Sequence, residues 1–505
     1  MNQSFKVYFT SDVHGYFFST TYANREDKNR GLLKCANGFK KDGNTLVLDA
    51  GDLLQGSAFT YYCQSELKSN KSIAEIMNQC GYDVITFGNH DFNYGCEYLD
   101  EYLNELNATP VCQNVKNLDG TTKYPYIIKT LENGLKIGIV GIVTDYVNIW
   151  EKPSNIESVK IVSPLEEAKL ALEELKGKVD VTICLYHGGF ERDLTTKKVL
   201  STSNENVAYR ICEELEFDLL LTGHQHMSIP GQFIHGTYVV QPKENATEYH
   251  EIHVTKTEDG LKINSSIKRP EEDSIVETTK ELLDIEENVQ NWLDNVVGTL
   301  EKPLLPEDKL TMAMKGNAIA DFLNKIQLHY SGAMFSAVSL ANEVSGFQSE
   351  VIRRDIIATY PYPNTLMVFE MTGKMLREAI ERSAEYFEID GNGNMSISKG
   401  FLEPKVEHYN YDFYAGLHYR IDPTKPISSR VVEFNYLNGR AIQDEDIVTV
   451  CINNYRASGA GNYPMYPKAK VIKEINVEMV EMIMSYFEEN KGLVVPVEKS
   501  IAIVE

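Results

Sequence analysis

The chain has 505 residues, too many for one ordinary hydrophobic core, so two or more domains are expected. Hydrophobic residues make up 43% and charged residues 24% of the sequence, which is ordinary for a soluble globular protein. The formal net charge of −24, without any basic stripe, excludes a binding face for a long nucleic acid, although bound cations can still bring a small phosphorylated substrate to an acidic enzyme.

Short apolar runs alternate with helical stretches through the first half of the chain. The runs are rich in Val, Ile and Leu, as buried strands are, and two of the stretches between them are predicted as helices, Ser72–Cys80 and Pro164–Leu175. This alternation predicts a layered α/β domain over residues 1–270. The predicted strands are Lys6–Thr10, Thr45–Leu48, Val84–Phe87, Lys136–Val143, Val181–Tyr186, Leu219–Leu221 and Tyr238–Val240.

The pattern changes between Glu271 and Leu300, where apolar residues recur at helical spacing opposite an acidic face. A helix is predicted there, and the prolines that follow it should end it. Residues 271–310 are therefore expected to link the first domain to a second α/β domain at 311–505. In that second domain the predicted elements are a helix through Asn317–Gln327 and strands near Thr365–Met371, Tyr419–Ile421 and Ile447–Ile452.

Five of the predicted strands end in polar residues that can bind a metal ion. Sites in open α/β sheets form beyond the carboxyl ends of the strands, so this pattern brings the residues together at one rim. Each motif alone has an ordinary explanation as a turn or a surface loop, but that explanation would have to hold independently five times. Imidazole, carboxylate and amide oxygen suit Zn²⁺ or Mn²⁺. The predicted ligands are Asp12, His14, Asp52, Asn89, His187, His224 and His226.

The order of these motifs is itself informative. Asp-x-His, Gly-Asp, Gly-Asn-His-Asp, His-Gly-Gly and Gly-His-x-His, in that sequence, resemble the calcineurin-like metallophosphoesterases. The segments Tyr360–Gly373 and Asn453–Tyr463 resemble the C-terminal domain of the 5′-nucleotidase family, and the second segment is similar to the 2′,3′-cyclic-nucleotide 2′-phosphodiesterase/3′-nucleotidase branch. The resemblance covers nearly the whole chain. It implies an α/β (α+β) fold, with a four-layer αββα catalytic domain followed by an α/β nucleotide-binding domain.

The resemblance also implies a cofactor and residue roles. Two divalent metal ions, Mn²⁺ or Zn²⁺, would support hydrolysis of a phosphate ester. His90 would stand beside the transferred phosphoryl group, where it stabilises charge or protonates the leaving oxygen, and Asp91 would orient its ring. In the implied ligand set, Asp12, His14 and His226 hold one ion, Asn89, His187 and His224 hold the other, and Asp52 bridges the two.

Aromatic pairs in this family sandwich the nucleobase, and the candidates here are Tyr455 and Tyr409. Stacking contributes roughly 1–3 kcal/mol per base and tolerates any base. Most of the 29 tyrosines must fill the core or the surface, so Tyr455 is favoured by its Asn-Asn-Tyr-Arg-Ala motif, while Tyr411 is an alternative to Tyr409. Asn454, in the same motif, is also predicted to contact the substrate.

The sequence departs from the family in one stretch of the second domain. Many relatives carry Asn-x-Gly-Gly-x-Arg, whereas Ser339–Gly346 lacks the arginine and has Glu343 after Asn342, so the usual substrate contacts do not carry over. The predicted function is a 2′,3′-cyclic-nucleotide 2′-phosphodiesterase and 3′-nucleotidase. The alternatives are a 5′-nucleotidase or broader nucleotide phosphatase, and a non-catalytic nucleotide-binding protein. The intact ligand set and the His90–Asp91 pair argue against the last of these.

Location and partners are predicted from the same sequence. No apolar run approaches the length of a membrane helix, and the motif at Asp12 comes too early to leave room for a secretory signal. The 8 cysteines are scattered without a Cys-x-x-Cys pair, so they are predicted to be reduced, buried thiols. We therefore expect a cytoplasmic enzyme that binds a small nucleotide and neither a long nucleic acid nor a membrane.

Overall fold

The computed structural model describes residues 3–199, 204–271, 277–362, 364–389, 393–403, 406–475 and 477–495. The chain divides into two compact units, Met1–Gln290 and Asn291–Glu505. The division falls inside helix α8 (Lys280–Leu293), within the segment predicted as a linker. Among the described residues, none of the helices has both the length and the apolar character that a membrane crossing requires.

The first of two six-stranded sheets in unit 1 carries three of the predicted metal motifs. Its parallel strands end level with one another, because Thr10 lies opposite Asp49 and Asp49 lies opposite Ile85. The loops that follow these three strands therefore begin at the same edge of the sheet. In sheet order the strands are β15 (Gly260–Lys268), β14 (Tyr249–Thr257), β1 (Gln3–Thr10), β2 (Thr45–Asp49), β3 (Val84–Ile85) and β4 (Thr109–Pro110).

The second six-stranded sheet carries the other two motifs. Its central strands are also parallel, and Tyr186 lies opposite Thr222, so His187 and the loop after Thr222 share one edge. In order the strands are β12 (Ile229–Ile234), β13 (Thr237–Gln241), β11 (Leu219–Thr222), β10 (Val181–His187), β8 (Lys136–Val143) and β7 (Ile127–Thr130).

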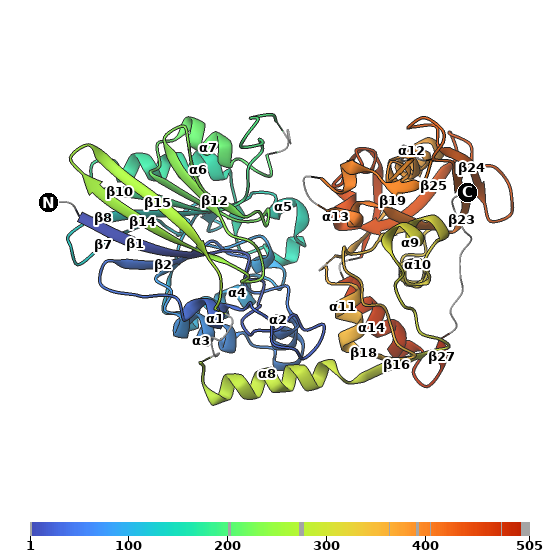
Figure 1. Ribbon diagram of the computed structural model, residues 1–505, viewed down its shortest axis with the longest axis horizontal. Coiled ribbons are helices and arrows are strands. Elements are labelled where there is room, and N and C mark those ends of the chain that lie inside the picture. Colours follow the sequence, from blue (N-terminus) through green and yellow to red (C-terminus); the bar gives the residue numbers. More distant parts are fainter. Residues whose placement is uncertain are drawn as a thin grey trace. The chain divides into compact units, whose positions relative to one another are not determined.

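The two sheets pack face to face and helices cover their outer faces. Residues of both sheets, such as Leu48 and Leu221, share one fully buried core. A second core joins the outer face of the second sheet to α6 (Pro164–Leu175) and α7 (Ala208–Glu214). Figure 1 shows α1 (Leu32–Ala36), α3 (Lys71–Cys80) and α4 (Cys96–Glu105) on the opposite side. This order confirms the predicted αββα layers.

Helix α6 illustrates why the local prediction succeeded. The Ser163 hydroxyl accepts a hydrogen bond from the Glu166 amide, Pro164 occupies the first turn, and the helix therefore begins where the sequence places it. All eight cysteines of the chain are buried and none forms a disulfide, as predicted.

The helix predicted between Glu271 and Leu300 is wrong at its C-terminal end. Helix α8 stops at Leu293, and Val296–Leu300 forms strand β16 instead. This strand pairs antiparallel with β18 (Glu350–Ile352) and parallel with β27 (Val494–Val495). Two valines, a glycine and a threonine favour a strand over a helix, and distant strands supply the hydrogen bonds. Residues 272–276 of the predicted helix lie outside the described residues.

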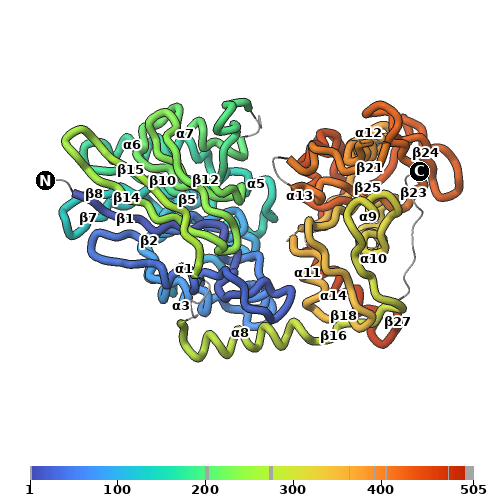
Figure 2. Tube along the Cα trace, viewed as in Figure 1, coloured from blue at the N-terminus to red at the C-terminus, as the bar shows by residue number. Residues whose placement is uncertain are grey.

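Unit 2 is built on a mixed five-stranded sheet, and its predicted strands and its predicted helix are all present. Helix α10 (Ala318–Ser331) is capped by the Asn317 side chain and packs on the sheet with α12 (Gly373–Ala384) and α14 (Met479–Glu489). Figure 2 follows this unit from yellow to red. In sheet order the strands are β22 (Asp412–Ala415), β17 (Phe335–Ser339), β25 (Ile447–Asn453), β19 (Leu366–Thr372) and β26 (Lys470–Ile475).

Candidate metal centre and catalytic residues

Five of the seven predicted ligands have a backbone conformation that residues with a side chain rarely adopt. Their φ angles are positive, in the left-handed region, where a Cβ atom crowds the backbone. Such conformations persist only when the surrounding structure imposes them, and they concentrate at functional sites. The residues and angles are Asp12 (55°), His14 (50°), Asp52 (58°), His224 (71°) and His226 (57°).

Glycines in the motifs let two of the ligand loops approach closely. A Cβ atom on Gly51 would lie 2.1 Å from the amide nitrogen of Gly88, and a Cβ atom on Gly88 would lie 2.0 Å from Oδ1 of Asp52. No larger residue fits at either position without moving a backbone. The glycines of Gly-Asp and Gly-Asn-His-Asp are therefore required by the contact between the loops.

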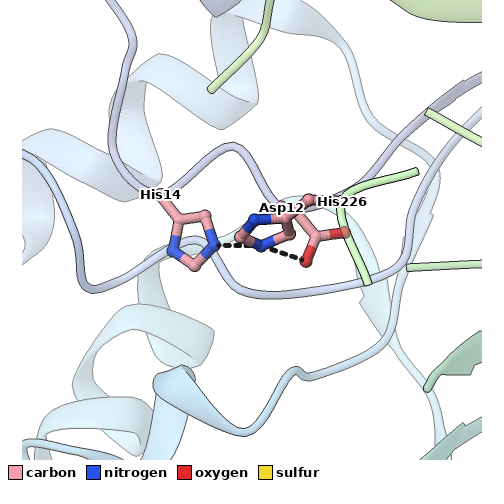
Figure 3. A group of neighbouring side chains, drawn as sticks. All are labelled: Asp12, His14 and His226. Atoms are coloured by element: carbon pink, nitrogen blue, oxygen red, sulfur yellow. Dashed lines mark hydrogen bonds and ion pairs between the residues drawn. The ribbon is translucent and has the colours of Figure 1, made fainter. Parts of the chain in front are cut away.

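The first group of ligand atoms belongs to Asp12, His14 and His226 (Figure 3). Nε2 of His226 lies 3.3 Å from Oδ1 of Asp12 and 3.1 Å from Nε2 of His14. At most one of two facing imidazole nitrogens can donate a hydrogen bond to the other. Two nitrogen lone pairs and a carboxylate oxygen directed to one place form a donor set that fits a cation.

The second group comprises Asp52, His187 and His224, and the predicted ligand Asn89 lies beside it. Nε2 of His187 is buried 3.1 Å from Oδ2 of Asp52 but forms no hydrogen bond. Nδ1 of His224 lies 2.9 Å from Oδ1 of Asn89. The same Asp52 oxygen lies 3.8 Å from Nε2 of His14 in the first group. The carboxylate thus lies between the two groups, as a bridging ligand must.

The other ring nitrogens of these histidines determine which nitrogen is available. Nδ1 of His14 lies 3.0 Å from the carbonyl oxygen of Gln55, and Nδ1 of His187 lies 2.7 Å from that of Ala50. A carbonyl oxygen can only accept, so each Nδ1 carries a proton and Nε2 is the nitrogen left to contact a metal ion. Both rings are therefore oriented with Nε2 toward the ligand group.

The charges in the two groups are strongly coupled. Burial alone would raise the pKa of Asp52, but the charge of the adjacent His187 outweighs it and holds that pKa well below its usual range. Burial alone would lower the pKa of His187, but Asp52 raises it to about 10. Burial lowers the pKa of His14 to about 4, opposed only in part by Asp52. Without metal, a proton on His187 thus balances the ionised Asp52, and a divalent cation bound at this group would take the place of that proton.

Comparison with known proteins identifies the family. The model of calcineurin-like phosphoesterases matches residues 5–228, and the model of the 5′-nucleotidase C-terminal domain matches residues 296–468. The solved structure of a putative 5′-nucleotidase from Staphylococcus aureus is 31% identical, covers 100% of both chains and superposes with a TM-score of 0.88. The chain belongs to the 5′-nucleotidase family of calcineurin-like phosphoesterases.

Relatives in this family carry several activities. The trifunctional nucleotide phosphoesterase protein YfkN of Bacillus subtilis is 26% identical over 559 residues, which cover 95% of this chain and 38% of that protein. The 2′,3′-cyclic-nucleotide 2′-phosphodiesterase/3′-nucleotidase of Haemophilus influenzae is 25% identical over 539 residues, with 90% of this chain and 80% of that protein covered. Membership confirms the predicted phosphoric ester hydrolase, whose family uses a dinuclear metal centre.

Asp91 serves a different purpose from the one predicted. Its Oδ1 atom accepts hydrogen bonds from the backbone amides of Leu53 (2.8 Å) and Leu54 (2.9 Å). Its Oδ2 atom accepts from the amides of Asp52 (2.9 Å) and Gly88 (2.7 Å). All four donors are backbone groups of the two loops that carry Asp52 and Asn89. Asp91 therefore holds the ligand loops in place.

The prediction that Asp91 orients the ring of His90 is consequently wrong. Nδ1 of His90 lies 2.8 Å from Oδ1 of Asn93 instead, and the side-chain amide of Asn93 donates to the carboxylate of Glu151. Both oxygens of Asp91 are occupied by backbone amides of the ligand loops, so the short side chain cannot also reach the ring. Asn93 and Glu151, which lie behind the His90 ring, belong to no common motif, because they are 58 positions apart in the sequence.

Two more residues next to the ligands were missed by the sequence analysis. Oε1 of Glu205 lies 3.0 Å from Nε2 of His224, on the ring nitrogen opposite the one beside Asn89. The indole of Trp150 stacks on the His224 imidazole, with ring centroids 5.5 Å apart and an angle of 24°. Both residues lie in a loop or a short helix without periodicity, so no sequence pattern marks them. The one signal in the sequence was the rarity of tryptophan, because the chain has only two.

The candidate tyrosines of unit 2 lie side by side. The ring centroids of Tyr409 and Tyr455 are 6.5 Å apart at 71°, an edge-to-face contact that must open for a base to enter between parallel rings. Tyr455 is 44% exposed and so available to a ligand. The alternative, Tyr411, is wrong, because its ring is buried in the core and its hydroxyl donates to the carbonyl oxygen of Ala313.

Two asparagines near this pair support the backbone. Oδ1 of Asn454 accepts from the amide of Thr365 at 3.2 Å, so this predicted substrate contact uses its oxygen within the fold. Asn342, from the stretch that departs from the family pattern, donates to the carbonyl of Val406 and accepts from the amide of His408. It therefore anchors the segment that precedes Tyr409.

Proposed function

We propose that the protein is a 2′,3′-cyclic-nucleotide 2′-phosphodiesterase and 3′-nucleotidase. The observation that carries the hydrolytic part is the position of Asp52 between two groups of ligand atoms. The choice of substrate is supported by the Asn453–Tyr463 segment and by the name of the Haemophilus influenzae relative. In that segment the buried Arg456–Asp412 ion pair, 2.9 Å long, fixes the turn on which the exposed Tyr455 stands.

The following residues have proposed roles. Asp12, His14 and His226 would hold one cation, Asn89, His187 and His224 would hold the other, and Asp52 would contribute to both. The two cations would neutralise the phosphoryl oxygens and activate water. Nε2 of His90 faces the reacting group, because Nδ1 is occupied by Asn93, and it stabilises the charge that develops there or protonates the leaving oxygen. In unit 2, Tyr455 and Tyr409 would bind the base.

The native ions are proposed to be Mn²⁺ or Zn²⁺. The donor set combines imidazole nitrogens, carboxylate oxygens and one amide oxygen, without a thiolate, which suits these borderline ions. Elemental analysis of the purified protein tests this assignment. Two equivalents of Mg²⁺ or Ca²⁺, which prefer an all-oxygen shell, would contradict it.

A panel of substrates with Mn²⁺ separates the proposed activity from its alternatives. We expect release of phosphate from 3′-nucleotides and opening of 2′,3′-cyclic nucleotides at higher kcat/KM than hydrolysis of 5′-nucleotides. A preference for 5′-nucleotides would support the alternative that the Staphylococcus aureus neighbour favours by its name. A protein that holds two metal ions and a nucleotide but releases no phosphate from any of them would be a binding protein.

We also propose that the enzyme acts in the cytoplasm on small nucleotides. The eight buried, unpaired cysteines support a reducing compartment, where such thiols persist. Fractionation of native cells tests the location, and finding most of the protein in the medium or at the cell wall would contradict it.

A further inference from the structure

A chain of hydrogen bonds extends behind His90, away from the metal-ligand groups. Nδ1 of His90 contacts Oδ1 of Asn93, and Nδ2 of Asn93 donates to Oε1 of Glu151. The other oxygen of Glu151 accepts from Nδ2 of Asn155 at 2.9 Å, and the same amide group donates to the carbonyl oxygen of Asn93 at 2.7 Å. Asn93 and Glu151 are thus held from two directions.

The direction of donation along these hydrogen bonds follows from Glu151. The amino group of Asn155, which donates to a backbone carbonyl, also donates to one oxygen of Glu151. Burial raises the pKa of Glu151 and these amide bonds lower it; in its ionised form the other oxygen only accepts, so the amino group of Asn93 must point toward it. The carbonyl oxygen of Asn93 must then point toward His90. Because a carbonyl oxygen also only accepts, Nδ1 of His90 must carry the proton. The orientation of one amide therefore fixes the tautomer of the imidazole.

The other ring nitrogen is the one that remains for chemistry. The His90 ring lies edge to face with the ring of His14, a predicted ligand, with centroids 5.5 Å apart. The backbone amide of His90 donates to Oδ1 of Asp52 at 2.8 Å, so the residue is tied to the metal-ligand loops at its main chain. With the main chain and Nδ1 both fixed, the ring has one orientation.

We propose that Asn93 and Glu151 are positioning residues that hold His90 as the Nδ1–H tautomer and direct its Nε2 atom to the phosphoryl group. Glu151 touches neither substrate nor metal in this arrangement and acts only through Asn93. The inference rests on the proposed role of His90 in phosphate ester hydrolysis, but not on which nucleotide is cut.

The test uses the full-length, Zn²⁺-loaded protein and three variants. Glu151→Gln keeps the shape but can offer an amino group to Asn93, whose amide then turns and presents its own amino group to Nδ1. Asn93→Asp faces Glu151 with a second carboxylate. The double variant Asn93→Asp/Glu151→Gln restores the pattern, because its new carboxylate accepts from Nδ1–H of the imidazole and its new amide donates to that carboxylate. Glu101→Gln, which removes a half-buried carboxylate bonded to Ser69, is the matched control.

Two measurements decide the outcome. In ¹⁵N spectra of labelled histidines, with the His90 signal assigned by its loss in His90→Gln, we expect Glu151→Gln to move His90 away from the Nδ1–H form. Hydrolysis of bis-p-nitrophenyl phosphate should lose about 10-fold or more in kcat, with KM and metal content unchanged, since a positioned acid–base group contributes roughly 10²–10⁴-fold. The double variant should recover most of that loss, and Glu101→Gln should match the wild type.

An unchanged His90 tautomer in Glu151→Gln would overturn the proposal, and so would a double variant no more active than Glu151→Gln alone. A proportional loss of metal content would assign Glu151 to folding and would likewise overturn it. Because the spectrum needs no turnover and the ester carries no base, a wrong nucleotide assignment leaves these results unaffected. Failure of this inference and failure of the proposed function are therefore separately visible.

Discussion

Replacing Asp91 by asparagine distinguishes a residue that holds the ligand loops from one that assists the chemistry. Each Asp91 oxygen accepts two backbone amides, those of Leu53 and Leu54 on one side and those of Asp52 and Gly88 on the other. In Asp91→Asn the oxygen keeps one pair, while the amino group faces the other pair of donors. Either orientation of the amide therefore loses two hydrogen bonds.

The cost follows from these two lost bonds. A hydrogen bond to a charged group contributes about 1.5–3 kcal/mol, so Asp91→Asn should lower the free energy of unfolding of unit 1 by about 3–6 kcal/mol. A domain is stable by only about 5–15 kcal/mol, so the loss is large. Burial and the charge of Asp52 raise the pKa of Asp91. The carboxylate is therefore less strongly favoured in its charged form, and we expect a loss of unfolding free energy toward the lower end of that range.

Urea unfolding of the chelated protein measures the loss. In a Trp292→Phe background Trp150, on α5 (Val147–Trp150), is the remaining tryptophan and reports unit 1 by its fluorescence. The midpoint should fall sharply in Asp91→Asn, and metal affinity should fall with it. The control is Glu101→Gln, which replaces another carboxylate of unit 1 whose partner is the Ser69 hydroxyl. That hydroxyl can turn and accept, so the control keeps its bond. An unchanged midpoint with kcat reduced about 100-fold would refute the reasoning and return Asp91 to the mechanism.

Three further outcomes are expected. His90→Ala should retain two metal ions and lose about 10²-fold or more in kcat, and near-wild-type turnover at saturating substrate would remove His90 from the reaction. Tyr455→Ala should cost roughly 1–3 kcal/mol in nucleotide kcat/KM yet spare bis-p-nitrophenyl phosphate, and an equal loss on both would make Tyr455 a folding residue. Burial raises the pKa of Asp49 from 3.8 to about 8, so the folded protein favours the protonated carboxyl group. The stability that the protonated Asp49 contributes is present below pH 3.8 and is lost as pH rises toward 8. Asp49→Asn should therefore gain stability relative to wild type as pH rises through this interval in urea titrations, and parallel pH profiles would contradict this.

The predicted ligands come together because each one stands at the end of a buried strand. The apolar runs before Asp12, Asp52 and His187 are strands β1, β2 and β10, and parallel strands necessarily end at a common edge. The sequence alone could place the residues at that edge but not the conformations with positive φ that turn the side chains inward.

The errors arose where long-range contacts decide the structure. Asp91 adjoins His90 in the sequence, so adjacency suggested a contact, but the backbone of a loop that comes much earlier in the chain takes its oxygens. Strand β16 followed a helical pattern without a break and was decided by pairing with strands that come much later in the chain. Glu151 has no local pattern at all, because its role depends on a partner 58 positions away.

The spread of the ligands along the chain has a consequence for biogenesis. His14 and His226 face each other across a separation of 212 residues, and the seven predicted ligands extend from Asp12 to His226 in the sequence. The first group is incomplete without His226 and the second without His224, so a nascent chain cannot capture both ions until His226 has left the ribosome and both sheets have assembled. With the proposed ligands, metal loading would mark the completion of the catalytic domain, and a chain truncated before His224 would hold neither complete group.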